Sequence, residues 1–555
     1  MEKPRDLPPA ADAIQGANPF VGMTRRHMAQ AAARWAGAAA RNPLVATSEV
    51  LKWAGEEMKV LAGVSDIEPD TKDRRFTDSA WTNPLWRRLG QAYLASGRSL
   101  LDSTDKFGLD EKSAARARFA LTQLVEATAP TNNFWTNPAA MKRAVQTRGQ
   151  SLLDGGRHFV HDVVRNGGMP SQVDTRPFKV GETLAVTPGA VVHRSPLFEL
   201  IQYQPTTSQV MSRPTLVIPP QINRYYFLDL APGRSFVEYT LSRGIQVFMI
   251  SWRNPTKEQR DWGIEDYVLA CVEALEVASE ITGSDSVNTV GFCAGGMTQC
   301  ATVNHLVASG RDLVASATLA VTLIDTGIGS TLNMFSTERT IRTAIRRSRR
   351  KGVLEGKELA RVFAWVRPND LVWNYWVSNY LLGEDPPAFD VLAWNADATN
   401  LPARLHEDFM NLWNGNAFMN PGSLKVFGIP VDLATIKQDA YVVGALTDHL
   451  VPWQSAYAAT QALGGHVRYV LSNSGHIQAL VNPPGNPKAS FYTNDDVPPD
   501  PQEWLAGATA VRKSWWEDWA DWTVDRSGES RPARDGLGSE THPAIAAAPG
   551  EYVRR

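Results

Sequence analysis

The chain has 555 residues, 43% of them hydrophobic and 21% charged, which is typical of a globular protein with two or more domains. Its formal net charge of −2 argues against nucleic acid as the main partner. Three cysteines are too few, and odd in number, for a disulfide framework, so we expect a reducing, cytoplasmic location.

No membrane-spanning segment is expected. Residues 1–6 lack the apolar core of a secretory signal. The longest apolar run, residues 313–324, is too short and too often interrupted by Ser and Thr to cross a bilayer.

Residues 1 to about 190 are expected to form a mostly helical domain. Two roles are open for it: docking on a catalytic domain, or contact with a partner or an apolar surface. We favour docking, because apolar stripes on helices usually face a core. The predicted helices cover residues 28–40, 50–61, 84–101 and 114–128.

From about residue 191 to residue 555, short β-rich runs alternate with helical stretches. This alternation predicts a mostly parallel sheet with functional groups at the carboxyl ends of its strands. The predicted strands are 197–203, 215–218, 245–251, 286–290, 315–321, 440–444 and 467–471, and the predicted helices are 235–243, 264–281, 298–308 and 453–463.

Between about residues 326 and 437 the alternation stops. The segment is Arg-rich over residues 339–351 and then rich in aromatic residues. We expect an inserted cap subdomain over the active site, with most of its aromatic rings in a core. An alternative role for some rings is to line a passage for an acyl chain.

Near the end of the chain, four tryptophans recur at three- and four-residue spacing, which places them on one face of a helix: Trp515, Trp516, Trp519 and Trp522. We expect this face to pack on the catalytic domain, and contact with a hydrophobic product is the alternative. The tail over residues 526–555 is rich in Pro, Gly, Ala and charge and should be largely irregular and lie on the surface.

The motif Gly291–Gly296, with the sequence GFCAGG, follows a predicted strand and precedes a predicted helix. This is the context of a nucleophile elbow with Cys293 in place of the usual serine. The flanking glycines leave room for a sharp turn, and the helix N-terminus favours a thiolate. The alternative is a buried, inert cysteine beside a glycine-rich turn.

Two further residues complete a possible catalytic triad. Asp448 follows a predicted strand and precedes a Pro-initiated helix, and His476 lies on a Ser/Gly loop after the last predicted strand. The chain order of nucleophile, acid and base is that of α/β-hydrolases. His449 is an alternative base, although its position next to Asp448 directs its side chain elsewhere.

An oxyanion hole needs two N–H groups near the nucleophile. One is expected from Ala294. The second is expected from the loop at residues 219–223, where Pro219 and Pro220 lack an N–H and leave Gln221 or Ile222 as the donor.

A cysteine nucleophile favours acyl transfer over hydrolysis. A thiolate exchanges one thioester for another at little cost, so the acyl group stays activated for an alcohol acceptor, provided that a cap excludes water.

Several separated motifs together resemble the polyhydroxyalkanoate (PHA) synthase family over nearly the whole chain. The single-subunit type of this family is the most similar. The motifs are Asp73–Phe76, Asn166–Pro170, Pro219–Tyr226, Ser251–Pro255, Gly291–Gly296, Asn369–Trp376, Asp448–His449 with Val451–Trp453, and Ser474–His476.

This resemblance implies an α/β-hydrolase fold with a cap, and polymerisation of (R)-3-hydroxyacyl-CoA into a storage polyester with release of CoA. It implies Cys293 as the nucleophile that holds the growing chain, His476 as its base, and Asp448 as the carboxylate that helps to activate the 3-hydroxyl group, directly or through His476. It further implies a homodimer on cytoplasmic granules, with no cofactor and no metal. Thr322, Ser474 and Gln478 are expected at the substrate pocket.

The features that relate to monomer length are mixed. Length and the stretch 254–260 resemble the synthases that take medium-chain monomers, whereas Phe292 and Thr322 resemble the short-chain type. A bulkier pocket favours shorter monomers, so we expect short-chain or mixed use.

Two other functions remain open. One is a cysteine hydrolase of the same fold, acting on esters, thioesters or the polymer. The other is a granule-associated scaffold without activity. The long helical N-terminal region disfavours the first, and an intact Cys, Asp and His in order disfavours the second.

Overall fold

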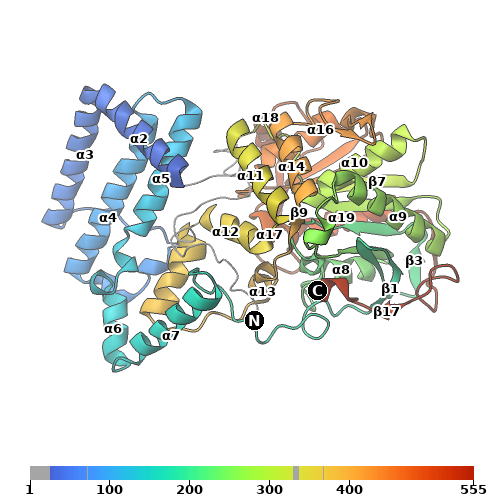
Figure 1. Cartoon of the computed structure of the whole chain (residues 1–555), viewed down its shortest axis with the longest axis horizontal. Coiled ribbons are helices and arrows are strands. Elements are labelled where there is room, and N and C mark those ends of the chain that lie inside the picture. Colours follow the sequence, from blue (N-terminus) through green and yellow to red (C-terminus); the bar gives the residue numbers. More distant parts are fainter. Residues whose placement is uncertain (1–24, 72, 329–336, 367) are drawn as a thin grey trace. The chain divides into compact units, whose positions relative to one another are not determined.

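The computed structural model describes residues 25–71, 73–328, 337–366 and 368–555 (Figure 1). These residues divide into two compact units. The first unit combines the chain up to Thr175 with a short piece ending at Thr340 and the segment Glu358–Phe389. The second unit holds the remainder, from Arg176 to Arg555.

The first unit is helical. Two of its helices, α4 and α5, begin after residues whose side chains cap a free N–H group: Asn83 accepts from the N–H of Leu85, and Asp110 accepts from that of Ser113. The helices are α2 (Arg25–Arg41), α3 (Pro43–Ala62), α4 (Pro84–Asp102), α5 (Glu111–Ala127), α6 (Pro138–Gln146), α7 (Gln150–Arg165) and most of α12 (Gly356–Val366), with π-helical turns η8 (Asn369–Trp373) and η9 (Trp376–Leu381).

Within this unit, η9 packs beside α7 (Figure 1). The carboxylate of Asp162, whose side chain is buried, accepts hydrogen bonds from the Tyr380 hydroxyl (2.7 Å) and from the N–H of Ser171 (2.9 Å). Gln172 donates to the carbonyl of Leu371 at 2.5 Å. The segment Glu358–Phe389 therefore belongs with the N-terminal helices.

This division departs from the expected boundaries in two places. Residues 176–190 fall in the second unit, although we expected a boundary near residue 190. Residues 358–389, expected within one insertion over 326–437, fall in the first unit because their polar anchors lie on α7 and the chain that follows it.

The described residues of the second unit form an eleven-stranded sheet in the order β15-β14-β13-β12-β7-β6-β4-β5-β2-β1-β17. The central strands from β13 to β5 are parallel, and the outer pairs on both sides are antiparallel. The strands of this sheet are β1 (Gly189–Arg194), β2 (Phe198–Tyr203), β4 (Thr215–Ile218), β5 (Val247–Trp252), β6 (Val287–Phe292), β7 (Val314–Ala320), β12 (Asp439–Ala445), β13 (Val467–Ser472), β14 (Phe491–Thr493), β15 (Thr509–Val511) and β17 (Ala546–Ala547).

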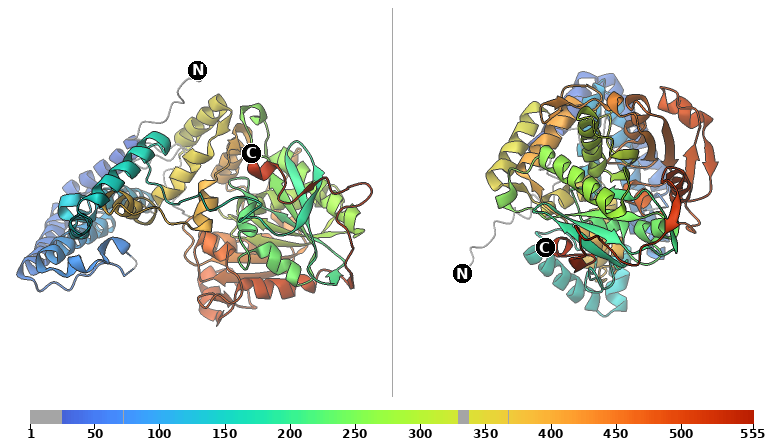
Figure 2. Two further views of the ribbon diagram at one scale, coloured as in Figure 1. Left: turned by 90° about the horizontal axis from the view of Figure 1, so that it is seen from below. Right: turned by 90° about the vertical axis from the view of Figure 1, so that its right-hand side faces the viewer.

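Helices lie on both faces of this sheet (Figure 2). The helices of the second unit are α8 (Phe236–Ser242), α9 (Ile264–Thr282), α10 (Ala294–Ala308), α11 (Glu338–Lys351), α13 (Asp390–Ala396), α14 (Ala403–Gly415), α15 (Trp453–Tyr457), α16 (Ala459–Ala462), α17 (His476–Leu480), α18 (Pro501–Gly507) and α19 (Trp515–Val524).

Short two-stranded pairings lie outside this sheet. They involve β3 (Gln209–Met211) with β16 (Ser530–Pro532), β8 (Val353–Leu354) with β9 (Leu401–Pro402), and β10 (Lys425–Val426) with β11 (Ile429–Pro430).

All seven predicted strands are present, within two residues at each end. The predicted helices of both halves are also present, but α3 and α10 begin earlier than predicted, and the predicted helix 453–463 is divided into α15 and α16. Of the antiparallel outer strands, β2 was predicted, whereas β1, β14, β15 and β17 were not. The tail has few regular elements, but it is not only a surface extension. Its strand β17 pairs with β1, and Tyr552 and Val553 are buried.

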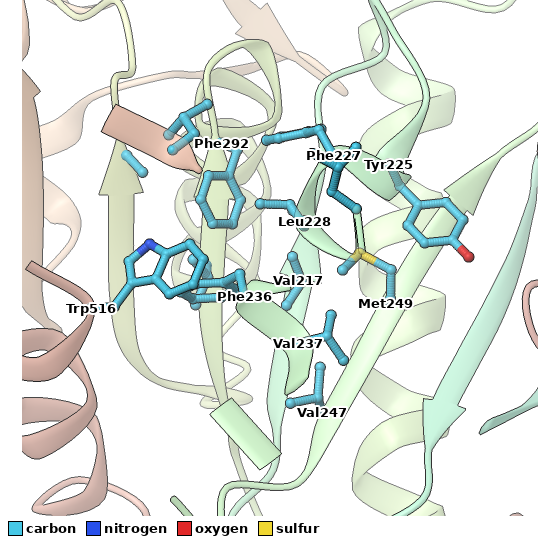
Figure 3. Close-up of a cluster of buried hydrophobic side chains, with 14 of the residues drawn as sticks. Val217, Tyr225, Phe227, Leu228, Phe236, Val237, Val247, Met249, Phe292 and Trp516 are labelled. Carbon is cyan, nitrogen blue, oxygen red and sulfur yellow. The ribbon is translucent and has the colours of Figure 1, made fainter. Parts of the chain in front are cut away.

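A large apolar core lies on one face of the sheet (Figure 3). Phe292, the last residue of β6, packs edge-to-face against Phe227 and Phe236 at ring-centroid distances of 5.9 and 5.4 Å. The predicted tryptophan face of α19 packs into this core. Trp519 is fully buried, and its ring centroid lies 4.7 Å from that of Phe236. The expectation that α19 packs on the catalytic domain is confirmed.

The opposite face of the sheet is covered by α9 and α10. A Cβ atom on Gly291, the neighbour of Phe292 in β6, would overlap the side chain of Gln299 in α10. Because successive positions in a strand point to opposite faces, Phe292 points away from α10 and into the core.

Replacing Trp519 with Ala should strongly destabilise the second unit. The indole is fully buried and donates to the Thr318 hydroxyl at 3.0 Å, so its loss leaves a cavity and an unmatched acceptor. Comparable truncations cost about 3–5 kcal/mol. Calorimetry should show a lower unfolding temperature for this variant. Trp135→Ala is the control, because the Trp135 side chain is 75% exposed, and equal shifts for both variants would contradict the assigned core.

Candidate active site

Cys293 stands at the sharp turn between β6 and α10. Its backbone has φ of +52° and ψ of −120°, a strained conformation for a residue with a Cβ atom. The Cys293 N–H donates to the carbonyl of Ala320 in β7 at 2.9 Å, which holds the turn against the sheet. The side chain is partly exposed at the N-terminus of α10. These features are those of a nucleophile elbow.

The glycines after Cys293 allow neighbouring segments to approach the turn. A Cβ atom on Gly295 would overlap the carbonyl oxygens of Ile218 and Pro219, and one on Gly296 would overlap the side chain of Thr322. The loop after β4 and the chain after β7 therefore both contact the elbow. The expectation that glycines beside Cys293 leave room for a sharp turn is confirmed.

Asp448 and His476 come from two adjacent parallel strands. Asp448 follows β12, and His476 begins α17 after β13. The Nδ1 atom of His476 lies 2.5 Å from Oδ2 of Asp448, and the Asp448 side chain has no exposed area. The other carboxylate oxygen accepts the N–H groups of Leu450 (2.8 Å) and Val451 (3.0 Å). Both oxygens of this buried carboxylate are thus used.

The pair holds opposite charges in spite of its burial. Burial raises the pKa of Asp448, but the His476 charge and hydrogen bonds outweigh it and leave this pKa below its usual value. For His476 the effect of burial has the opposite sign and lowers the pKa. The interactions with Asp448 and then with Cys293 outweigh burial and hold this pKa well above 6.5. The buried carboxylate thus stabilises the protonated form of the imidazole, which makes His476 a stronger base.

The Cys293 side chain lies close enough to His476 to add to the rise in its pKa. The structure thus brings the three predicted triad residues together. The other two thiols differ: Cys271 and Cys300 are fully enclosed, and burial raises the pKa of each to about 12. His449, the alternative base, is partly buried.

The segment Pro219–Asn223, here called the oxyanion loop, lies beside the elbow. Within the described residues, no acceptor takes up the main-chain N–H of Gln221, Ile222 or Ala294. The Gln221 side chain donates to the Thr298 hydroxyl in α10 at 3.0 Å, which ties the loop to the helix behind Cys293. These N–H groups have the freedom that an oxyanion hole requires.

The expected pocket residues occupy different environments. Thr322 is buried and packs on Gly296, Ser474 is partly buried, and Gln478 is exposed on α17. Their part in a pocket stays a prediction. Phe292, which resembles the short-chain type, points into the core, because its strand position faces α8 and α19.

Sequence reasoning missed the residues that support this site. Trp515 in α19 donates to the carbonyl of Ala479 in α17 at 2.6 Å and so supports the helix that carries His476. Val321, at φ of +44°, turns the chain towards Thr322, although β-branched residues rarely adopt this conformation. A branched residue at a left-handed position has no local sequence signal.

The described residues hold no group of three or more His, Cys, Asp or Glu side chains arranged to bind a metal ion. None of their helices combines the length and hydrophobicity needed to span a bilayer.

Comparison with known proteins gives two family matches and several long relatives. Residues 72–240 match the N-terminus of poly-beta-hydroxybutyrate polymerase (PhaC), and residues 223–483 match the alpha/beta hydrolase fold. The chain is 46% identical to poly(3-hydroxyalkanoate) polymerase 1 of Ectopseudomonas oleovorans, over 98% of this chain and 97% of that one. It is 42% identical to the polymerase subunit PhaC of Cupriavidus necator, over 89% and 85% of the two chains.

The sheet, the elbow and the match over residues 223–483 define an α/β-hydrolase fold. The long relatives then specify the family within that fold, since they align over nearly the entire length. The chain belongs to the poly(3-hydroxyalkanoate) polymerase family.

Replacing Asp448 with Asn should lower the pKa of His476, since it removes the largest interaction that raises this pKa while burial remains. NMR titration of labelled histidine rings measures the shift. Asp110→Asn, at the start of α5 in the other unit, is the control. An unchanged His476 titration would contradict the assigned pairing.

The same variant tests the pH dependence of stability. The raised pKa of His476 gives stability that is complete below about pH 6.5 and is lost as pH rises through that pKa. The lowered pKa of Asp448 gives stability that is present above about pH 3.9 and is lost below it. The difference in unfolding temperature between wild type and variant should therefore be largest between about pH 4 and 6.5.

Proposed function

We propose that this protein polymerises (R)-3-hydroxyacyl-CoA into a polyhydroxyalkanoate polyester and releases CoA, through an acyl group held on Cys293. The observation that carries the proposal is the buried Asp448–His476 pair acting on a partly exposed thiol at a strained elbow. Membership of a family whose relatives are named poly(3-hydroxyalkanoate) polymerases supports this substrate class.

In the first step, His476 accepts the proton of the Cys293 thiol. The thiolate attacks the thioester carbonyl, and the negative oxygen is stabilised by the N–H of Ala294 and by that of Gln221 or Ile222. The carbon–sulfur bond to CoA breaks, and the CoA thiolate takes the proton from His476. The acyl group is then a thioester of Cys293 with its activation retained.

In the second step, the 3-hydroxyl group of another acyl unit attacks the Cys293 thioester. His476 accepts the hydroxyl proton, an ester bond forms, and the Cys293 thiolate leaves and is reprotonated. Both oxygens of Asp448 are engaged and its side chain is buried, which supports a role through His476 rather than direct contact with the hydroxyl.

Location on cytoplasmic storage granules and a homodimer form part of the same proposal. Support comes from α7, where Leu153, Val160 and Val164 lie on one face and are each more than 60% exposed. An apolar face on a helical unit suits contact with a polyester surface or with a second copy.

Cys293→Ala should abolish CoA release from 3-hydroxybutyryl-CoA, measured as free thiol together with insoluble polymer. Cys300→Ala is the matched control, because that thiol is buried and should not react. Retained release in Cys293→Ala would overturn the assigned nucleophile.

The same assay with the wild-type protein separates the candidate functions. Polymer with CoA release supports the synthase. Release of the acid monomer would instead indicate a cysteine hydrolase, and an absence of turnover would indicate a scaffold.

A further inference from the structure

Arg224 directly follows the oxyanion loop, and its guanidinium is almost completely buried, with the side chain 7% exposed. Its Nη1 donates to the main-chain oxygen of Tyr552 at 3.0 Å, and its Nη2 donates to that of Arg555 at 2.7 Å. Its Nε faces Oδ1 of Asp397 at 3.3 Å. The planar guanidinium and its N–H donors, here called the Arg224 fork, therefore join the loop to two distant segments of the same unit.

The main chain around Arg224 is held as well. Its carbonyl accepts from the Trp394 indole at 2.8 Å, and Asn223 forms an isolated bridge with Ala398. The carbonyl of Gln221 accepts from the Thr399 hydroxyl at 3.3 Å. Residues 394–399 thus fix one side of the loop, and residues 552–555 fix the other through the Arg224 side chain.

The segment that receives Arg224 is itself anchored on the sheet. Glu199, fully buried in β2, accepts the N–H groups of Glu551 and Tyr552 through Oε2, both at 2.9 Å. The Tyr552 hydroxyl donates to the carbonyl of Ser195 at 2.8 Å. The main-chain oxygens that bind Arg224 therefore have positions set by strand β2.

We infer that Arg224, held by the main-chain oxygens of Tyr552 and Arg555, is a positioning residue that fixes the N–H groups of the oxyanion loop. The inference rests on the proposed function, because it assumes that these N–H groups bind the developing oxyanion. Oxyanion donors act only when they are already in place, so a small displacement of the loop reduces the rate. Arg224 touches no reacting atom and acts through the loop.

The test compares two reactions of the same thiol. Acyl transfer from 3-hydroxybutyryl-CoA builds negative charge on a carbonyl oxygen, whereas alkylation of Cys293 by iodoacetamide builds none. In Arg224→Met, kcat should fall about 10- to 100-fold with KM little changed, and the alkylation rate should stay at the wild-type value. Arg224→Lys should recover only part of kcat, because an ammonium cannot reproduce the fork.

Arg253→Met is the matched control. The Arg253 guanidinium lies 5.7 Å from the ring centre of Tyr552 on the same segment, and the described residues give it no hydrogen bond to the oxyanion loop. Its kcat should remain at the wild-type value. A comparable fall in both variants would assign the effect to the tail as a whole and overturn the role of Arg224.

Two variants keep the test valid if Arg224→Met does not fold. Asp397→Asn weakens the same fork at a side chain that is 36% exposed, and Glu199→Gln loosens the segment that receives it. Both should lower kcat without slowing alkylation. Unchanged kcat in these variants, or parallel loss of kcat and alkylation, would overturn the inference. Turnover by Cys293→Ala would instead reject the proposed function itself.

Discussion

The backbone of Cys293 is the constraint on which the candidate site depends. A φ of +52° is costly for a residue with a side chain, and it persists because β6, β7 and α10 over-determine the turn. The strain turns the thiol out of the sheet, while the preceding side chain, Phe292, enters the core. The close contacts at Gly295 and Gly296 then bring the oxyanion loop and Thr322 to the same point.

The Asp448–His476 pair shows how burial and charge oppose each other at this site. Burial alone would neutralise both groups, yet their mutual charge and hydrogen bonds outweigh it. The backbone N–H groups of Leu450 and Val451 add to the stabilisation of the carboxylate. The result is a charged pair in a dry environment, where its effect on a neighbouring thiol is greatest.

The segment that was expected to form one insertion is divided between the two compact units. A segment from the middle of the chain, Glu358–Phe389, is compact with the N-terminal helices rather than with the residues on either side of it. Its π-helical turns, η8 and η9, place Leu371 and Tyr380 against polar groups of the first unit. The expected single cap over 326–437 is thus shared between two compact bodies.

The amino-acid sequence by itself determined the parallel strands, the helices between them, the elbow and the order of Cys293, Asp448 and His476. Each of these has a local signal: a repeat of two or 3.6 residues, a glycine spacing, or a polar residue at the end of a strand. Only the tertiary structure decided that Phe292 faces the core, that residues 358–389 join the first unit, and that Arg224 connects the oxyanion loop to residues 552–555. These features depend on contacts between residues that lie up to 331 positions apart in the chain, and such contacts leave no periodic pattern near either partner.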